Sequence, residues 1–362
     1  MPLSENTKFM QIALNLSKRW VGLTAPNPTV GCVMVKDGQI IATGITAKGG
    51  RPHAEYIALH KAGDAAKGAT AYVTLEPCSH YGETPPCADS LIKSGVARVV
   101  VATKDSFVKV SGEGIKKLKD AGIEVVTGVC EEDARKINEG FFSIHEKGRP
   151  YVTLKLATCA NGKIADKLGN SKWITGEDTR AYAHYIRAKN DAILVGVGTV
   201  IADDPILNCR LNGMENQSPI RVITDNSLRT PIDSKLVRTA HDIPTYIICS
   251  TDAENKNIEQ SGVEILRCKA DVNVEEAVKI LASKGITRLM VEGGSKVASS
   301  FIKANVVDEL IWMQAEKEID EDGIDAIEAM DIKKIAEEKF EKISELQMEN
   351  DKVTLYNSIK TR

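Results

Sequence analysis

The chain has 362 residues, of which 43% are hydrophobic and 27% charged, and its formal net charge at pH 7 is −3. This length predicts two domains, and the composition is that of a globular protein. The near-neutral charge argues against a nucleic-acid partner, and no apolar run has the length of a membrane span. The start lacks the apolar stretch of a signal peptide, and the eight scattered cysteines fit a reducing compartment, so we expect a cytoplasmic protein.

The first half of the chain alternates short apolar runs with helical patterns. An amphipathic helix is predicted over residues 8–18, and Lys36-Asp37-Gly38 is a strong hairpin signal between the first two strands. The predicted strands are short and rich in β-branched residues, and they cover 29–35, 39–44, 69–75, 96–102 and 123–127. With helices between the later strands, this order predicts a mixed sheet covered by helices.

A metal-binding pattern lies within this half. His53-Ala54-Glu55 is followed by Cys78 and, after eight intervening residues, by Cys87. One imidazole and two thiols supply three ligands to a tetrahedral zinc, which leaves a position for a water whose pKa the metal lowers. Glu55 is badly placed to be a ligand but well placed as the general base that carries a proton from water to a leaving amine. A His-x-Glu sequence followed by Pro-Cys-x-x-Cys is typical of zinc nucleobase deaminases, although most of them have two residues between the cysteines where this chain has eight.

The flanking sequence favours a catalytic zinc over a structural one. Cys78 follows a predicted strand, and His53 and Glu55 fall in the first turn of a predicted helix. A second helix is predicted to begin at Pro86-Cys87, where its N-terminus would favour the Cys87 thiolate. The alternatives are a closed structural site or a buried histidine with two unrelated thiols. A structural site normally has four protein ligands and has no need of Glu55.

The second half is predicted to begin at a short polar break over residues 145–150, which gives domains 1–146 and 147–362. A strand over 151–157 and the turn Asn161-Gly162 precede a helix that is capped at Thr175. Two Gly-rich segments then follow predicted strands: Gly196-Val197-Gly198-Thr199, and Glu292-Gly293-Gly294-Ser295. Each can bring backbone amides to a phosphate, although neither has the third glycine of the dinucleotide fingerprint. Together they favour a nucleotide site.

Motifs in both halves resemble those of the bifunctional deaminase–reductase family of riboflavin biosynthesis. The segment PCSHYGETPPC resembles the deaminase half, and K-L-A, S-x-W-I-T, G-x-G-T-V-x-x-D-D-P, V-E-G-G and V-D-E-L resemble the reductase half in that order. The resemblance implies an α/β protein with a cytidine-deaminase-like mixed sheet, helices on both its faces, and a dihydrofolate-reductase-like second domain. It also implies zinc-dependent hydrolytic deamination of a diaminopyrimidine ribosylamino phosphate. NADPH-dependent reduction of the ribosyl to a ribityl chain would follow.

The resemblance assigns roles to the matching positions. NADPH would contact Ala157, Trp173, Thr199, Asp203, Gly294, Ser295, Lys296, Val297, Ala298, Ser299 and Ser300. The phosphorylated pyrimidine substrate would contact Asn27, Asp105, Ser171, Arg187, Leu207, Arg210 and Glu292. Taken alone, Asn27 is a typical turn residue, and an isolated arginine is typically a solvated surface charge. Guanidinium groups nevertheless match phosphate bidentately, as Arg187 and Arg210 would.

The sequence also departs from the family pattern. Thr46 stands where many relatives have histidine, and Glu83 stands where many have a basic residue that plausibly meets the substrate phosphate. A carboxylate there would repel a phosphate, so recognition would fall to another basic residue near the motifs. The candidates are Lys48, Arg51 and Lys104.

Three other functions remain open at this point. A zinc deaminase with a degenerate C-terminal assembly domain would fit the charged segment 314–323, where the family's proline and glycines are mostly replaced. A tRNA-adenosine or cytidine deaminase would leave the second half unexplained. A zinc-stabilised binding protein would require Glu55 to be dispensable. The sequence assigns no proton donor for the reduction and leaves open whether the chain forms a homo-oligomer.

Overall fold

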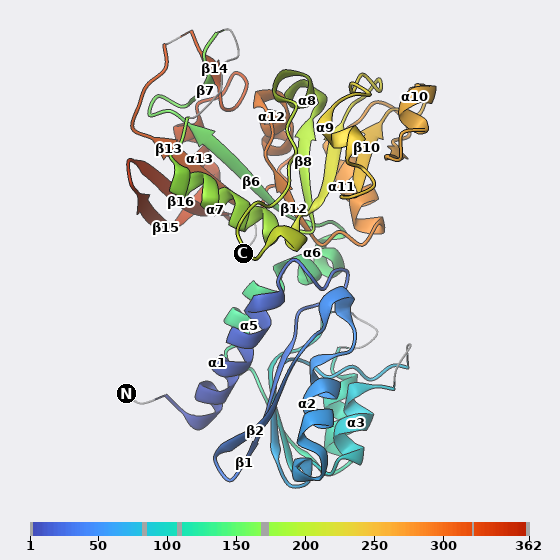
Figure 1. Cartoon of the computed structure of the whole chain (residues 1–362). Coiled ribbons are helices and arrows are strands. Elements are labelled where there is room, and N and C mark those ends of the chain that lie inside the picture. Colours follow the sequence, from blue (N-terminus) through green and yellow to red (C-terminus); the bar gives the residue numbers. More distant parts are fainter. Residues whose placement is uncertain (1–2, 82–84, 107–110, 168–173, 321, 360–362) are drawn as a thin grey trace. The chain divides into compact units, whose positions relative to one another are not determined.

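The computed structural model describes residues 3–359 except 82–84, 107–110, 168–173 and 321 (Figure 1). The predicted site residues Ser171 and Trp173, and the divergent Glu83, lie outside the described residues. Internal contacts divide the chain into two compact units, Met1–Gly148 and Arg149–Arg362. Within the described ranges, no helix has both the length and the apolar character needed to cross a membrane.

The first unit is built on one mixed sheet. Its strand order is β2-β1-β3-β4-β5. The first strand in sequence is antiparallel to both of its neighbours, and the last three are parallel to one another. The strands are β1 (Gly31–Lys36), β2 (Gln39–Ile45), β3 (Thr70–Leu75), β4 (Arg98–Thr103) and β5 (Glu124–Thr127). The mixed sheet predicted from the order of apolar runs is therefore confirmed.

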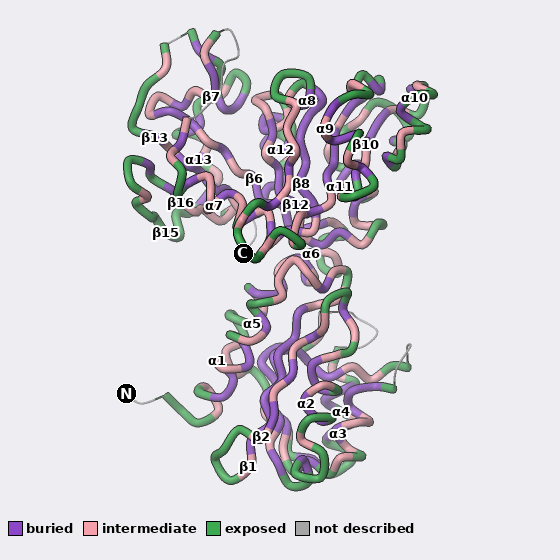
Figure 2. Tube along the Cα trace, in the orientation of Figure 1, coloured by how far each residue is buried: buried purple, intermediate pink, exposed green. Residues whose placement is uncertain are grey.

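Helices cover both faces of this sheet, because successive residues of its central strands point to opposite faces and are apolar on both. On β3, Val73 belongs to the core that includes Leu91 of α3, whereas Tyr72 belongs to the core that includes Met10 of α1 (Figures 1 and 2). The helices are α1 (Glu5–Ser17), α2 (Ala54–Ala62), α3 (Cys87–Lys93), α4 (Glu113–Asp120), α5 (Glu131–Ile137) and α6 (Glu139–Lys147). Helix α6 continues through the first half of the predicted break over residues 145–150, and Gly148, whose φ is +67°, is its C-cap.

The second unit is built on a nine-stranded sheet in the order β11-β10-β9-β8-β12-β6-β13-β16-β15. The first seven strands of that order are parallel, and the hairpin of the last two is antiparallel. The strands are β6 (Tyr151–Thr158), β8 (Ala192–Gly196), β9 (Ile220–Thr224), β10 (Thr245–Cys249), β11 (Glu264–Arg267), β12 (Arg288–Val291), β13 (Glu309–Ala315), β15 (Phe340–Met348) and β16 (Asp351–Ser358). A separate pair joins β7 (Lys163–Ala165) to β14 (Ile324–Asp325).

Two sequence predictions in this unit need correction. Helix α7 begins one residue later than predicted, with Gly176 rather than Thr175 as its N-cap. The predicted loop after β8 is in fact the start of helix α8, for which Gly196 is the N-cap. A Cβ at Gly196 would lie 2.8 Å from Cγ2 of Val297, so any other residue here would have to displace the Val297 side chain. The helices are α7 (Glu177–Ala188), α8 (Val197–Asp203), α9 (Lys235–Arg238), α10 (Lys256–Glu259), α11 (Val274–Ser283), α12 (Ser295–Lys303) and α13 (Ile332–Lys339).

Candidate active sites

Three predicted zinc ligands meet at one edge of the first sheet. His53 is the N-cap of α2, Cys78 follows β3, and Cys87 is the first residue of α3. Nδ1 of His53 lies 3.6 Å from Sγ of Cys78 and 3.4 Å from Sγ of Cys87. Ligand atoms at zinc–ligand distances of about 2.0–2.3 Å around a tetrahedral zinc lie roughly 3.5 Å from one another. The donor set and its spacing therefore fit zinc with one open position.

The two cysteines of the site interact directly. The backbone N–H of Cys87, at the start of α3, donates to Sγ of Cys78 over 3.2 Å. The side-chain hydrogen bond with Cys87 is the main cause that lowers the pKa of Cys78 to about 4, burial acts in the opposite direction, and the backbone N–H of Cys87 has a smaller lowering effect. The pKa of Cys87 is raised, first by its bond to Cys78. The N-terminus of α3 thus acts on the sulfur of Cys78, and the expected stabilisation of a Cys87 thiolate stays a prediction.

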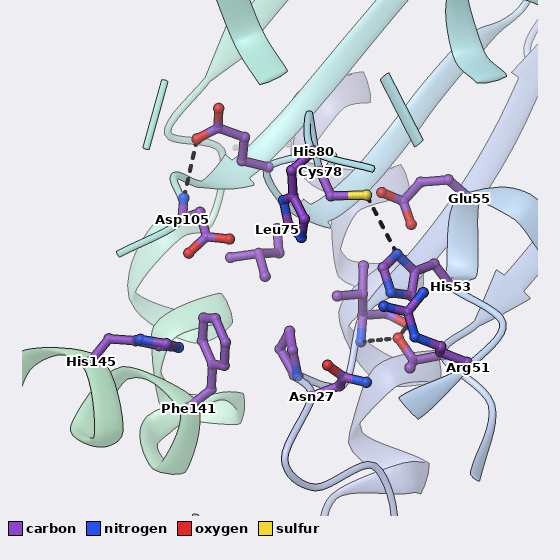
Figure 3. A pocket seen from close by; sticks show the side chains of 14 residues that line it. Asn27, Arg51, His53, Glu55, Leu75, Cys78, His80, Asp105, Phe141 and His145 are labelled. Atoms are coloured by element: carbon purple, nitrogen blue, oxygen red, sulfur yellow. Dashed lines mark hydrogen bonds between the residues drawn. The ribbon is translucent and has the colours of Figure 1, made fainter. Parts of the chain in front are cut away.

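Glu55 lies in the first turn of α2, close to the ligands but outside the ligand group (Figure 3). Its side chain is 3% exposed. Burial is the main cause that raises its pKa to about 7, and the nearby charge of Cys78 adds to the effect. A carboxyl group with a pKa near neutrality can both accept and return a proton, as a general acid–base catalyst must.

These groups line one end of a cavity of about 180 Å³ (Figure 3). The predicted substrate contacts Asn27 and Asp105 both lie on its wall. The carboxylate of Glu76 also lies there, but it accepts the backbone N–H groups of Asp105, Gly112 and Ile115, so its role is to hold the loop before α4. The remaining lining residues carry no acidic group, namely Pro28, Val30, Thr46, Arg51, Leu75, His80, Phe141 and His145.

The second unit has a cavity of about 330 Å³ at the carboxyl ends of β6, β8 and β12. Ligands of open α/β sheets bind at such ends. The predicted site residues that line this cavity are Ala157, Arg187, Thr199, Asp203, Arg210, Glu292 and Gly294. Leu207 is buried with a φ of +55°, and its side chain is not part of the wall. A substrate contact there would have to come from its backbone.

A buried charge cluster lies at the centre of this cavity. Nε and Nη2 of Arg187 donate to the two carboxylate oxygens of Glu292 over 2.6 and 2.8 Å. Nζ of Lys155 lies 3.8 Å from the same carboxylate. Burial would raise the pKa of Glu292, but the charges of Arg187 and Lys155 hold it at about 2. Burial is likewise the main cause that lowers the pKa of Lys155.

Basic side chains of α7 form one wall of the cavity. Arg180, His184 and Arg187 are spaced by four and three residues, which places them on one face of the helix. Nδ1 of His184 and Nη1 of Arg187 both lie within hydrogen-bond distance of the carbonyl oxygen of Asn208, at 3.0 and 3.1 Å. Burial, followed by the two arginines at 187 and 210, lowers the pKa of His184 to about 4. This face is suited to a phosphate.

The residues around Gly294 fit a dinucleotide. Gly294 has a φ of +55°, and a Cβ there would lie 3.2 Å from Oγ1 of Thr199. Helix α12 begins at Ser295, so its first amide groups are available to a pyrophosphate. The amide of Ala298 already donates to the carbonyl of Gly294, and the hydroxyl of Ser299 donates to Glu328. The predicted NADPH contacts Ser295, Lys296, Val297, Ala298, Ser299 and Ser300 all stay predictions, and the cavity wall includes none of them.

Comparison with known proteins decides the family. The sequence model of the cytidine and deoxycytidylate deaminase zinc-binding region matches residues 3–103, and that of the RibD C-terminal domain matches residues 150–344. The chain is 47% identical to riboflavin biosynthesis protein RibD of Aquifex aeolicus over 85% of this chain and 86% of that one. It is 40% identical to RibD of Haemophilus influenzae over 97% of each chain. The chain belongs to the RibD family.

Solved structures agree with this assignment over the whole chain. A structure of Acinetobacter baumannii RibD matches with a TM-score of 0.89 at 37% identity, and it covers 98% of this chain and 99% of that one. A deaminase/reductase of Thermotoga maritima matches with a TM-score of 0.87 at 36% identity and the same coverage. The two-part α/β fold and the bifunctional deaminase–reductase activity are therefore confirmed, with zinc and NADPH as the cofactors. A RibD family match over 150–344 disfavours a degenerate C-terminal domain.

Several residues that line the two cavities were not predicted from the sequence. Phe141 and His145 line the first cavity from α6, far along the chain from the zinc motif. No motif marks them, and only the fold brings them to the site. Lys155 and His184 of the second cavity had clearer signals. Lys155 lies within the K-L-A motif, and His184 precedes Arg187 by nearly one helical turn.

Proposed function

We propose that this chain deaminates a diaminopyrimidine ribosylamino phosphate within residues 1–146 and reduces the product's ribosyl group to a ribityl chain within residues 147–362. The Thermotoga maritima relative is described as a diaminohydroxyphosphoribosylaminopyrimidine deaminase/5-amino-6-(5-phosphoribosylamino)uracil reductase. The observation that carries the proposal is that each unit has its own cavity, lined by residues suited to one of the two reactions. The first has the zinc ligands with Glu55, and the second has Lys155 and Glu292 beside the Gly294 turn. We also propose that the protein is cytoplasmic.

In the deaminase, the chain's own residues hold the reactants and move one proton. His53, Cys78 and Cys87 would hold zinc, which when bound lowers the pKa of a water and so supplies the nucleophile. Glu55 accepts a proton from the attacking water and gives it to the departing ammonia. Burial of Glu55 excludes competing solvent from this transfer. Asn27 lies on the cavity wall, where its side-chain amide donates to the carbonyl of Gly50 over 3.3 Å.

In the reductase, NADPH supplies the hydride when it is bound, and the protein orients and anchors the reactants. The amides that follow Gly294 would hold its pyrophosphate, and Arg210 at the cavity edge would bind the substrate phosphate. Reduction of the ring-opened imine also needs a proton at nitrogen. Lys155 is placed to give it, because its ammonium group lies within this cavity and burial lowers its pKa. Glu292 holds Lys155 and Arg187 in place through its two oxygens.

One assay tests both halves. Purified protein is given the phosphorylated diaminopyrimidine, first without and then with NADPH, while ammonia and NADPH are followed. We expect ammonia release without NADPH and an equal amount of NADPH oxidation once NADPH is added. NADPH oxidation without ammonia release would contradict the proposed order. Failure to oxidise NADPH with the deaminated compound would contradict the assignment of the second unit.

A further inference from the structure

His184 lines the cavity of the second unit, and no sequence motif gives it a role. It lies on α7, and its side chain is half-buried. Nδ1 of its ring lies 3.0 Å from the carbonyl oxygen of Asn208, a residue that is not part of the cavity wall. One edge of the imidazole is therefore fixed against the protein, while the ring itself forms part of the wall.

The bond to Asn208 decides which nitrogen of His184 carries the proton. A carbonyl oxygen can only accept a hydrogen bond, so Nδ1 must be the donor. Burial, followed by the charges of Arg187 and Arg210, lowers the pKa of the imidazole to about 4, so the ring is neutral at pH 7. A neutral imidazole with its proton on Nδ1 has a lone pair on Nε2. Nε2 is therefore an acceptor, and it has no hydrogen-bond partner among the described residues.

Asn208 holds His184 together with two cations of the same cavity. Its carbonyl oxygen also accepts from Nη1 of Arg187 over 3.1 Å, and its side-chain oxygen accepts from Nη1 of Arg210 over 3.0 Å. Arg187 is tied to Glu292 in the buried charge cluster, whereas Arg210 is exposed at the cavity edge. His184 is thus close both to the cluster at the reacting end and to the arginine that would bind the substrate phosphate.

This position indicates which part of the substrate meets Nε2. Phosphate oxygens are acceptors, so a phosphate suits the two arginines but does not suit an unprotonated Nε2. The sugar joins the phosphate to the carbon that is reduced, and its hydroxyl groups can donate. An acceptor close to both ends of the site therefore fits the hydroxyl groups of the sugar.

We propose that His184 accepts a hydrogen bond through Nε2 from the C2′ or C3′ hydroxyl of the reductase substrate, and so selects a ribosyl over a deoxyribosyl compound. The assignment rests on the proposed function, which supplies a phosphorylated ribosyl substrate. Both hydroxyl groups are present in the closed sugar ring and in the ring-opened imine. The same hydrogen bond can therefore hold the sugar before and after the ring opens.

The test separates the two nitrogens of His184 by two substitutions. In His184→Asn the shorter amide can still donate to Asn208 in place of Nδ1, but nothing replaces Nε2. In His184→Gln the longer side chain brings an amide oxygen to the position of Nε2, and the bond to Asn208 is lost. His241→Asn is the matched control, because His241 is an exposed histidine of the same unit outside the cavity.

NADPH oxidation is measured with the deaminated compound and with its 2′-deoxy and 3′-deoxy forms. We expect the wild type to lose roughly 3- to 10-fold in kcat/KM on one of the deoxy forms, the usual effect of one neutral hydrogen bond. His184→Asn should lose a similar factor on the ribosyl compound and nothing further on that deoxy form. His184→Gln should recover part of the loss, and His241→Asn should match the wild type. The NADPH affinity of His184→Asn, followed by fluorescence, should equal that of the wild type.

Three results would overturn the assignment. An equal loss on all three compounds in His184→Asn would show that Nε2 meets neither hydroxyl group. Wild-type kinetics in His184→Asn, with a loss in His184→Gln, would show that the bond to Asn208 is the whole role of the ring. A wild type that reduces all three compounds equally well would leave a working reductase without this contact. A wild type that does not oxidise NADPH even with the ribosyl compound would instead contradict the proposed function, and the assignment with it.

Discussion

The charge cluster of the second unit gives the most quantitative prediction. Glu292→Gln removes the negative charge that Arg187 and Lys155 share, and leaves two buried cations without it. The pKa of Glu292 is held at about 2 against an ordinary value of 4.5. That depression corresponds to about 3 kcal/mol of stability at neutral pH. Breaking a buried ion pair by removing one partner typically lowers stability by a similar amount, about 3–5 kcal/mol.

Calorimetry of the wild type and of the Glu292→Gln variant measures this loss of stability. The relevant unfolding transition is the one that NADPH stabilises. Its midpoint temperature should be lower in the Glu292→Gln variant by about 6–12 °C for a unit of this size. The pH dependence has a definite sign. Because the folded pKa is depressed, the contribution is fully present above pH 4.5 and is lost as pH falls toward 2. The difference in unfolding free energy between the wild type and Glu292→Gln should thus be constant from about pH 5 to 8 and shrink below pH 4.5.

A matched control is Glu264→Gln, which removes an exposed partner of Lys284. Exposed pairs contribute about 0–1 kcal/mol, so this variant should unfold almost like the wild type. If Glu292→Gln were as stable as Glu264→Gln at pH 7, the carboxylate would not be neutralising Arg187 and Lys155, and the account of the cluster would be wrong.

Three further predictions follow from the two units. Elemental analysis should find about one zinc per chain, and Cys78→Ser should lower that content; two zincs, or activity without any, would contradict the ligand set. Lys155→Met should abolish reduction while fluorescence titration still shows NADPH binding, whereas a loss of binding would make Lys155 a cofactor ligand. Arg221→Met should cost about 3–5 kcal/mol by denaturant unfolding, because the buried Arg221 donates to four carbonyl groups and two hydroxyls. Unchanged stability would show that those acceptors find other partners.

The sequence predicts the elements of this fold well where a periodic pattern has a clear end. The strand before Cys78 and the helix that begins after His53 both form as expected, because β-branched runs and capping positions act locally. The structure of the Gly196 segment was harder to predict, since two glycines within four residues indicate a loop. In the structure the strand instead continues directly into α8, with Gly196 as the N-cap close to Val297.

Residues that reach a site from distant elements were not predictable in the same way. His145 and Phe141 lie in a helix whose sequence shows only an ordinary amphipathic pattern. The choice among Lys48, Arg51 and Lys104 likewise depends on which side chain lines the cavity, and neighbours in sequence differ in that respect. Family resemblance located the chemistry, but the fold was needed to place these side chains against it.

The central claim is that one chain contains two independent catalytic sites, and Glu55→Gln tests it most directly. Ammonia release from the phosphorylated diaminopyrimidine and NADPH oxidation on the deaminated compound are measured on the same preparation. We predict that ammonia release falls by about 10²–10⁴-fold, because the proton carrier is lost, while zinc content stays the same. NADPH oxidation should equal that of the wild type. Loss of both activities in a folded protein, or ammonia release at the wild-type rate, would contradict the account.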